Sequence, residues 1–298
     1  MELLSAFPGA IAQGLIWGIM AIGVYITFKI LDIADLTVDG SICTGAAVCT
    51  VLVTKGVNVY LALLATVVAG LLAGLLTGLM HTVLGIPAIL SGILTQLILW
   101  SANLKIMGKA NISLSARSYK VLLTQMNINS SIAVLAVIGI ILIALLYWFF
   151  GTELGCSVRA TGCNLNMSRA QGINTNINIV LGLMLSNGIV ALSGALLAQY
   201  QGFADINMGK GAIVIGLAAV IIGEAVFSKI ARNFAVRLFA VIVGGIIYYI
   251  VYQVIIFLGI DTDLLKMLSA LVVAVFLGVP YVKKHYFASA VKGGKNNA

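Results

Sequence analysis

Apolar runs long enough to cross a membrane recur along the whole chain. About twenty apolar residues are enough for a helix to span a bilayer. We place nine such runs, of which the second is rather short, at Pro8–Ile30, Ser41–Thr54, Val57–Leu84, Ile86–Leu104, Ile132–Phe150, Ile177–Ala198, Gly211–Phe227, Val236–Leu258 and Leu264–Val279. The sequence therefore predicts an all-α polytopic membrane protein with a single transmembrane domain over residues 1–298.

The composition excludes a soluble globular protein. Hydrophobic residues make up 61% of the chain and charged residues 9%, whereas soluble domains are about a quarter charged. The 32 glycines and three prolines suit closely packed helices, so we expect helices throughout rather than a β-barrel. The N-terminal residues 1–7 have no basic region, so we expect no removable signal peptide.

The distribution of Lys and Arg predicts the orientation, because cytoplasmic loops of membrane proteins are enriched in these residues. The C-terminal tail, 281–298, contains Lys283, Lys284, Lys292 and Lys295, and is therefore expected in the cytoplasm. Counting spans backwards places the segment 151–176 in the cytoplasm and the N-terminus outside. Membrane orientation thus explains the net charge of +8, and we expect no nucleic-acid partner.

The longest polar stretch with helical character is GTELGCSVRATGCNLNMSRAQGINTN, residues 151–176. Within it, residues 164–171 predict a short helix that places Leu165, Met167, Ser168 and Ala170 on a small apolar patch beside Arg169. A helix of this length is not stable alone, so we expect it to occupy a groove of a cytoplasmic partner.

The loop 105–131 breaks the charge pattern, because the topology places it outside although it contains Lys105, Lys109, Arg117 and Lys120 and no acidic residue. These charges are either tolerated during membrane insertion or form a docking surface for an acidic extracellular partner.

As a group, the polar residues inside the spans predict a hydrated path, whereas hydrogen bonding between helices is the simpler explanation for any single one of them. The residues assigned to this path are Thr37, Asp39, Ser41, Thr44, Ser91, Thr95, Gln96 and Asn187. Glu224 lies near the cytoplasmic end of the seventh span. Its side chain either extends towards the membrane–water interface or contacts the cytoplasmic partner.

A weak internal similarity points to an inverted repeat. Ala34-Asp35-Leu36 follows the first span as Ala204-Asp205-Ile206 follows the sixth, 170 positions later. In the predicted topology the two copies enter the membrane from opposite sides, which is a recurring plan of transporters.

The sequence has no phosphate-binding loop, no HExxH and no Gly-x-Ser-x-Gly motif, and its four cysteines lack the spacing of a zinc site. We therefore expect neither catalysis nor a cofactor in this chain.

Three segments carry a family resemblance: GLIWGIMAIGVYITFKILDIADLTVDGSICTG, TELGCSVRATGCNLNMSRAQGINTN and GAIVIGLAAVIIGE. With them the chain resembles, over roughly residues 8–280, the permease subunit of ATP-binding-cassette importers of the branched-chain amino acid and ribose permease superfamily, and within it the tryptophan and tyrosine branch. The joint presence of DLTVDG and RATGxNxxMxxAxGIN makes this resemblance specific.

The resemblance implies a homodimer in the bacterial plasma membrane, with two ATPase subunits that bind ATP and Mg²⁺ and an extracellular substrate-binding lipoprotein. It implies a small solute, with an aromatic amino acid favoured, as the substrate. It also implies a cytoplasmic coupling helix that contacts the ATPase through Arg159, Ala160, Thr161, Gly162, Asn164, Met167, Ala170, Gly172 and Ile173. Cys163 departs from the acidic residue expected there, which leaves the local charge contacts open.

Two other classes of function stay open on sequence grounds. A secondary carrier or channel would transport without an ATPase, and an intramembrane enzyme would need a catalytic constellation, of which the sequence shows none.

Overall fold

The computed structural model describes residues 2–115, 119–227 and 233–258, together with single positions between 267 and 278. Within these ranges, seven helical segments are long and apolar enough to cross a membrane. The long helices are α1 (Glu2–Tyr25, continued by the π-helix η1, Ile26–Ile30), α2 (Thr37–Thr54), α3 (Val59–Thr82), α4 (Ala88–Met107), α5 (Ile128–Gly151), α8 (Thr175–Gln201) and α10 (Phe234–Phe257). The shorter ones are α6 (Glu153–Cys163), α7 (Leu165–Ala170) and α9 (Ala212–Phe227).

The predicted all-α membrane fold is confirmed, and each of the first eight predicted spans corresponds to a helix. Helices α2 and α5 each begin four residues earlier than predicted, at Thr37 rather than Ser41 and at Ile128 rather than Ile132. Helix α9 matches its predicted span to within one residue and, with 16 residues, is shorter than the roughly twenty that span a bilayer. The ninth predicted span lies mostly outside the described residues, and the tail 281–298 and Arg117 lie wholly outside them.

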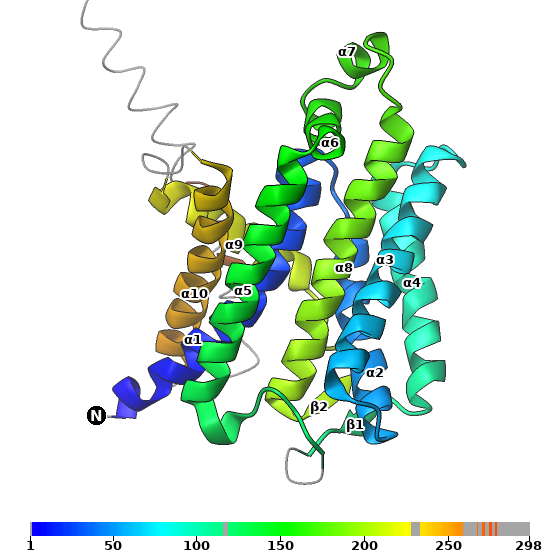
Figure 1. The fold of residues 1–298 in the computed structure, drawn as a ribbon. Helices are drawn as coiled ribbons and strands as arrows, with labels where there is room; N and C mark the ends of the chain where they lie inside the picture. Colours follow the sequence, from blue (N-terminus) through cyan, green and yellow to red (C-terminus); the bar gives the residue numbers. More distant parts are fainter. Residues whose placement is uncertain are drawn as a thin grey trace, which may run out of the picture.

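The long helices run between two ends of the bundle (Figure 1). One end carries α6 and α7, and we call it the α6–α7 end. The other, the ribbon end, carries two short strands, β1 (Asn111–Ser113) and β2 (Phe203–Asp205), which pair antiparallel with Asn111 opposite Asp205. This ribbon corrects the expectation of helices throughout, and it ties the loop between α4 and α5 to the end of α8.

Helices approach closely where glycines face a neighbouring backbone. A methyl group added at Gly74 of α3 would lie 2.7 Å from the Cα of Met184 on α8, and one added at Gly14 of α1 would lie 2.6 Å from the Cα of Ile246 on α10. Such small residues allow close contact where lipid provides no hydrophobic drive for association.

Helices α1 and α8 lie side by side and run in opposite directions. Ser186 donates to the carbonyl of Gly23 at 2.8 Å, and Ser193, farther along α8, donates to that of Ile16, earlier on α1, at 2.8 Å. Helices α2 and α3 both pack on α8, while α9 and α10 both pack on α1. The unit α8–α9–α10 therefore has the arrangement of α1–α2–α3 turned upside down, as the predicted inverted repeat requires.

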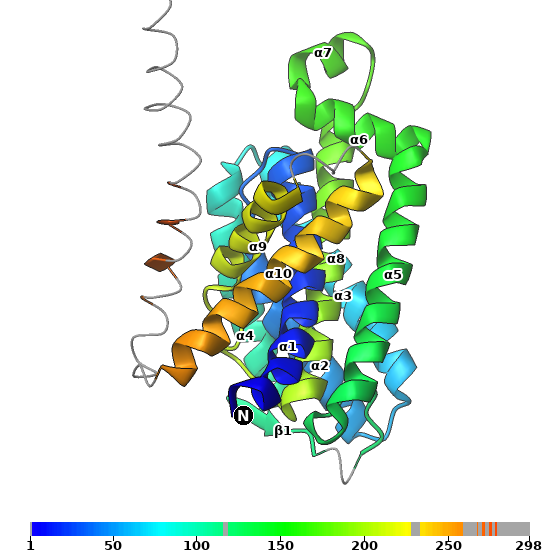
Figure 2. The same cartoon turned by 90° about the vertical axis from the view of Figure 1, so that its left-hand side faces the viewer.

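The connection after the first helix of each unit returns into the bundle. Residues 31–36 are not helical and include Asp32 with a φ of 56°, and they lead to an α2 that starts beside the middle of α8 (Figure 1). Residues 206–211 lead in the same way to α9, which rises towards the α6–α7 end (Figure 2). Helices α2 and α9 thus both begin inside the bundle, and for this reason we call them half-helices, although α2 has 18 residues.

Candidate translocation and coupling site

Asp35 is the centre of a buried polar cluster beside the start of α2. Its side chain is 2% exposed, and one carboxyl oxygen accepts the backbone N–H of Thr37 at 2.9 Å. The other accepts the Asn187 Nδ2–H at 2.7 Å, and the Ser41 hydroxyl donates to the Asn187 Oδ1 at 2.6 Å. Because Asn187 lies midway along α8, this cluster holds the returning connection at mid-depth in the bundle.

Three hydroxyl groups extend this cluster towards α3 and α4. Thr37 Oγ1 lies 2.7 Å from Thr77 Oγ1, which in turn donates to Thr95 Oγ1 at 2.9 Å. All three side chains are buried. Buried polar groups of this kind are stable only when hydrogen-bonded, so the chain of contacts links the half-helix to three neighbouring helices.

Asp39, in the first turn of α2, holds the start of α9. Its two carboxyl oxygens accept the backbone N–H groups of Gly211 at 2.9 Å and Ile213 at 3.0 Å. One turn along α2, the Cys43 Sγ accepts the N–H of Gly209 at 3.2 Å. The starts of both half-helices therefore meet at the same level of the bundle.

At the α6–α7 end, α6 lies on the bundle. Asn178 of α8 donates to the hydroxyls of Ser157 at 2.7 Å and Thr161 at 2.9 Å, and a side chain at Gly162 would collide with the carbonyl of Ile30. Helix α6 is therefore tied both to α8 and to the π-helix at the end of α1.

Helix α7 stands beyond the bundle, connected to it through α6 and α8 (Figures 1 and 2). Asn164 caps its start by accepting the N–H of Met167 at 3.0 Å, and Arg169 Nε donates to the Thr175 hydroxyl at 3.0 Å. The side chains of Met167 and Leu165 are 60% and 37% exposed, so the helix presents apolar surface outside the bundle.

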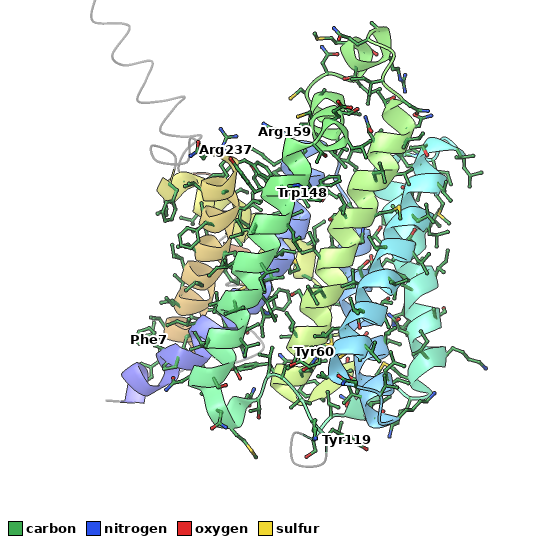
Figure 3. All side chains as sticks on the ribbon, viewed as in Figure 1. Phe7, Tyr60, Tyr119, Trp148, Arg159 and Arg237 are labelled. Atoms are coloured by element: carbon green, nitrogen blue, oxygen red, sulfur yellow. The ribbon has the colours of Figure 1, made fainter. Side chains whose placement is uncertain are left out.

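Two charged contacts lie at the same end. The Arg159 guanidinium carbon lies 5.6 Å from the centre of the Phe234 ring of α10 (Figure 3). Lys29 Nζ of η1 lies 2.8 Å from a carboxyl oxygen of Glu224, in the last turns of α9. Glu224 therefore joins the half-helix α9 to the end of α1.

The ribbon end carries the predicted basic residues. Lys105, Lys109 and Lys120 are all exposed, and Lys120 lines a cavity of about 480 Å³ together with Tyr60 and Tyr119. Figure 3 shows these two tyrosines near the ribbon end. The basic surface and the α6–α7 hairpin therefore lie at opposite ends of the bundle.

Comparison with known families identifies the chain. The model of the branched-chain amino acid transport system permease component matches residues 8–278. The chain belongs to this permease family. Members of this family are the permease component of a transport system and not catalytic enzymes. The permease is a membrane protein with several helical spans.

Curated relatives are consistent with this assignment. The permease is 42% identical over 92% of its length to a tyrosine transport system permease protein of Clostridioides difficile, covering 91% of that chain. It is 34% identical over 92% of its length to an uncharacterized protein of Rickettsia prowazekii, covering 97% of it. An autoinducer 2 import system permease protein of Salmonella typhimurium is 27% identical over 69% of the permease and 58% of its own length. No solved structure matches significantly.

The structure brings together some of the residues predicted for the path. Thr37, Ser41, Thr95 and Asn187 share the cluster around Asp35, whereas Asp39 contacts α9. The remaining predicted residues divide into Thr44 and Ser91, which are buried and bond to carbonyls of their own helices, and Gln96, which is half-buried. Their role in transport stays a prediction.

Two members of the cluster, Asp35 and Thr77, are absent from the predicted set. Thr77 lies within a long apolar span and shows no local signal. Asp35 did carry a signal, because it is the counterpart of Asp205 in the repeat. Each of these aspartates accepts the backbone N–H two residues farther on, from Thr37 at 2.9 Å and from Asn207 at 2.7 Å.

The predicted coupling residues lie on α6, on α7 and in the turn that follows, except Glu224, which lies on α9. Those exposed are Arg159, Asn164, Met167, Arg169, Ala170 and Gly172, those partly buried are Ala160, Gly162, Ile173 and Glu224, and Thr161 is buried. Thr161 therefore contributes to the docking of α6 on α8 rather than to an exposed surface.

Asn187→Leu is expected to lower the free energy of unfolding by about 2–5 kcal/mol. The Asp35 carboxyl and the Ser41 hydroxyl each lose a buried partner, which costs about 1–3 kcal/mol per group. Thermal unfolding in detergent measures the effect. Gln96→Leu, at a half-buried position, serves as the control and should change stability by less than about 1 kcal/mol. Equal melting temperatures for the two variants would contradict the structural role of Asn187.

Proposed function

We propose that this permease is the transmembrane subunit of an ATP-binding-cassette importer for a small solute, namely an amino acid, with aromatic amino acids favoured. Two copies enclose the translocation path. Two separate ATPase subunits, which bind ATP and Mg²⁺, contact the α6–α7 end, and a substrate-binding lipoprotein contacts the ribbon end. The α6–α7 end and the C-terminus then face the cytoplasm of a bacterium, and the ribbon end faces outwards.

The observation that carries this proposal is the exposed hairpin of α6 and α7. A six-residue helix is too short to be stable alone, and yet α7 is capped at its start and presents Met167 and Leu165 away from the bundle. Apolar side chains on a projecting helix fit a groove of a partner protein. Movement of the partner would reach η1 and α8 through the contacts of Gly162 and Thr161.

The substrate class rests on two observations. The relative from Clostridioides difficile is named for tyrosine transport and is similar over almost the full length. In addition, the described spans contain few ionisable side chains, and those at mid-depth, Asp35 and Asp39, are engaged in hydrogen bonds within the protein. A zwitterion suits such an interior better than a strongly charged solute.

Reconstitution in vesicles tests the proposal. The permease, the ATPase and the binding protein together should take up labelled L-tyrosine only when ATP is supplied on the ATPase side. Omission of the ATPase should abolish uptake even when an ion gradient is imposed. Gradient-driven uptake by the permease alone would instead identify a secondary carrier.

The basic surface at the ribbon end supports the placement of the binding protein. Lys105, Lys109 and Lys120 are exposed there, and the topology requires this end to face outwards if α6 and α7 face the cytoplasm. A positive surface would orient an acidic partner during encounter.

Changing Lys109, Arg117 and Lys120 together to Glu is expected to reduce stimulation of the ATPase by the binding protein at least about tenfold. Like charges facing each other across an interface cost several kcal/mol, and tenfold corresponds to about 1.4 kcal/mol. For the wild type, stimulation should weaken as salt rises, because the Debye length is about 8 Å at physiological ionic strength. If the binding protein stimulates the ATPase equally with the wild-type and the triple-variant permease at every salt concentration, these charges are only tolerated during membrane insertion and do not bind a partner.

A further inference from the structure

A cavity of about 280 Å³ lies between α1, α10, the first turn of α9 and the segment that leads into α9, and Ala270 also lines it. Gly211 lines it, and the N–H of Gly211 bonds to Asp39 in the first turn of α2. The cavity therefore lies at the level where the two half-helices begin. Its volume is just below the range of about 300–1,000 Å³ typical of sites for drug-sized ligands, so it suits a single-ring ligand.

Aromatic rings form much of the wall. Trp17 of α1 stacks on Tyr249 of α10 with ring centres 5.9 Å apart and planes 25° apart. Tyr249 also contacts Tyr248 at 5.6 Å and Tyr252 at 5.8 Å, and all four residues line the cavity. A further ring bound against this wall would gain aromatic contacts of the same kind, each of which adds to the affinity beyond its buried area.

Lys210 provides a positive charge at the edge of the same cavity. Its side chain is exposed, and within the part of the chain that the structure describes it makes no ion pair. The nearby N–H groups of Gly211 and Ile213 are already bonded to Asp39, so Lys210 is the cation left to meet a carboxylate.

We propose that this cavity is a binding site within the permease for the ring of an aromatic amino acid, whose carboxylate is held by Lys210. The inference rests on the proposed import of amino acids and adds the place where the substrate side chain is recognised. Aliphatic amino acids lack the ring that Trp17 and the three tyrosines would contact, so they bind this site more weakly.

Fluorescence of Trp17 tests the site directly. The chain has three tryptophans, and the other two, Trp100 and Trp148, are 46% and 71% exposed. Trp100→Phe and Trp148→Phe together leave Trp17 as the single reporter in the full-length permease. Addition of 4-nitro-L-phenylalanine, whose ring quenches indole emission, should reduce the fluorescence saturably. L-Tyrosine should compete with it, and L-leucine should not.

Two variants separate the contributions of the ring and the charge. Tyr249→Leu should weaken the binding of 4-nitro-L-phenylalanine about 2- to 10-fold, whereas Tyr147→Leu, at an exposed tyrosine of α5, should leave it unchanged. Lys210→Gln should weaken it about 3- to 10-fold, as expected for loss of one charge-assisted contact. The same variant should leave the quenching by 4-nitrobenzyl alcohol, which has no carboxylate, unchanged.

The outcomes distinguish this site from the proposed function. Unsaturable quenching, or equal competition by L-leucine, would overturn the aromatic site even if ATP-driven uptake of L-tyrosine is normal. If Lys210→Gln weakens the binding of 4-nitrobenzyl alcohol as much as that of 4-nitro-L-phenylalanine, Lys210 does not hold the carboxylate. Saturable quenching with the expected variant effects would support the site even in a protein that needs no ATPase, which would show that only the proposed import mechanism is wrong. Melting temperatures of all variants verify that they are folded.

Discussion

Replacement of Met167 by Asp should abolish ATP-driven uptake and leave the membrane bundle intact. Met167 is 60% exposed at the tip of α7, so its loss removes no contact within the core. In the proposed complex it enters an apolar groove of the ATPase, where an unpaired carboxylate would be buried. Loss of such an interface anchor costs about 2 kcal/mol or more, which corresponds to at least about a 30-fold reduction in affinity.

Copurification of the ATPase with tagged permease measures this effect, together with uptake of L-tyrosine by reconstituted vesicles. Asn166→Asp provides the matched control, because Asn166 is an exposed neighbour on the same short helix and is not among the predicted contact residues. An ATPase that copurifies equally with both variants, with equal uptake, would remove α7 from the coupling contact.

The second large effect is expected for Gly45→Leu, which should prevent correct packing of α2 on α8. A methyl group at Gly45 would lie 2.6 Å from the carbonyl carbon and 2.8 Å from the Cα of Ala191. The obstructing atoms belong to a helix backbone and cannot rotate away as a side chain would. Overpacking usually costs about 1–3 kcal/mol, and we expect more than about 3 kcal/mol where the clash is with backbone.

A loss of this size is a large part of the 5–15 kcal/mol by which proteins are typically stable. The yield of monodisperse protein and its melting temperature measure the effect. Gly151→Leu is the matched control, since Gly151 ends α5 and a methyl group there meets nothing within 4 Å. If the two variants are equally stable, α2 and α8 do not pack as closely as the structure indicates.

The sequence correctly predicted those elements whose structure depends on residues close to one another in the chain. The short helix expected over residues 164–171 is observed as Leu165–Ala170, because the Asn164 side chain caps its start within the same segment. The long apolar spans could be predicted for the same reason, because the length and hydropathy that allow a segment to span a membrane are properties of that segment alone.

The predictions were incomplete where partners are distant in sequence. The start of α2 was placed too late because Thr37 and Asp39 are polar, and their partners Thr77 and Gly211 lie 40 and 172 residues away. The ribbon was missed because strands of three residues, 111–113 and 203–205, are too short for an alternating pattern to be visible. The same distance explains why Asp35 was not assigned to the path although the repeat had marked it, because its bond to Asn187 spans 152 residues.

The half-helices have an electrostatic consequence for the passage of cargo. The first turn of a helix carries about half a positive charge from its aligned peptide dipoles, and broken helices of transporters often direct this charge at an anionic substrate. Here the protein's own carboxyl groups occupy those positions, Asp35 at the start of α2 and Asp39 at the start of α9. A travelling carboxylate is therefore not attracted by the start of either helix, so its attraction at this level has to come from a basic side chain such as Lys210.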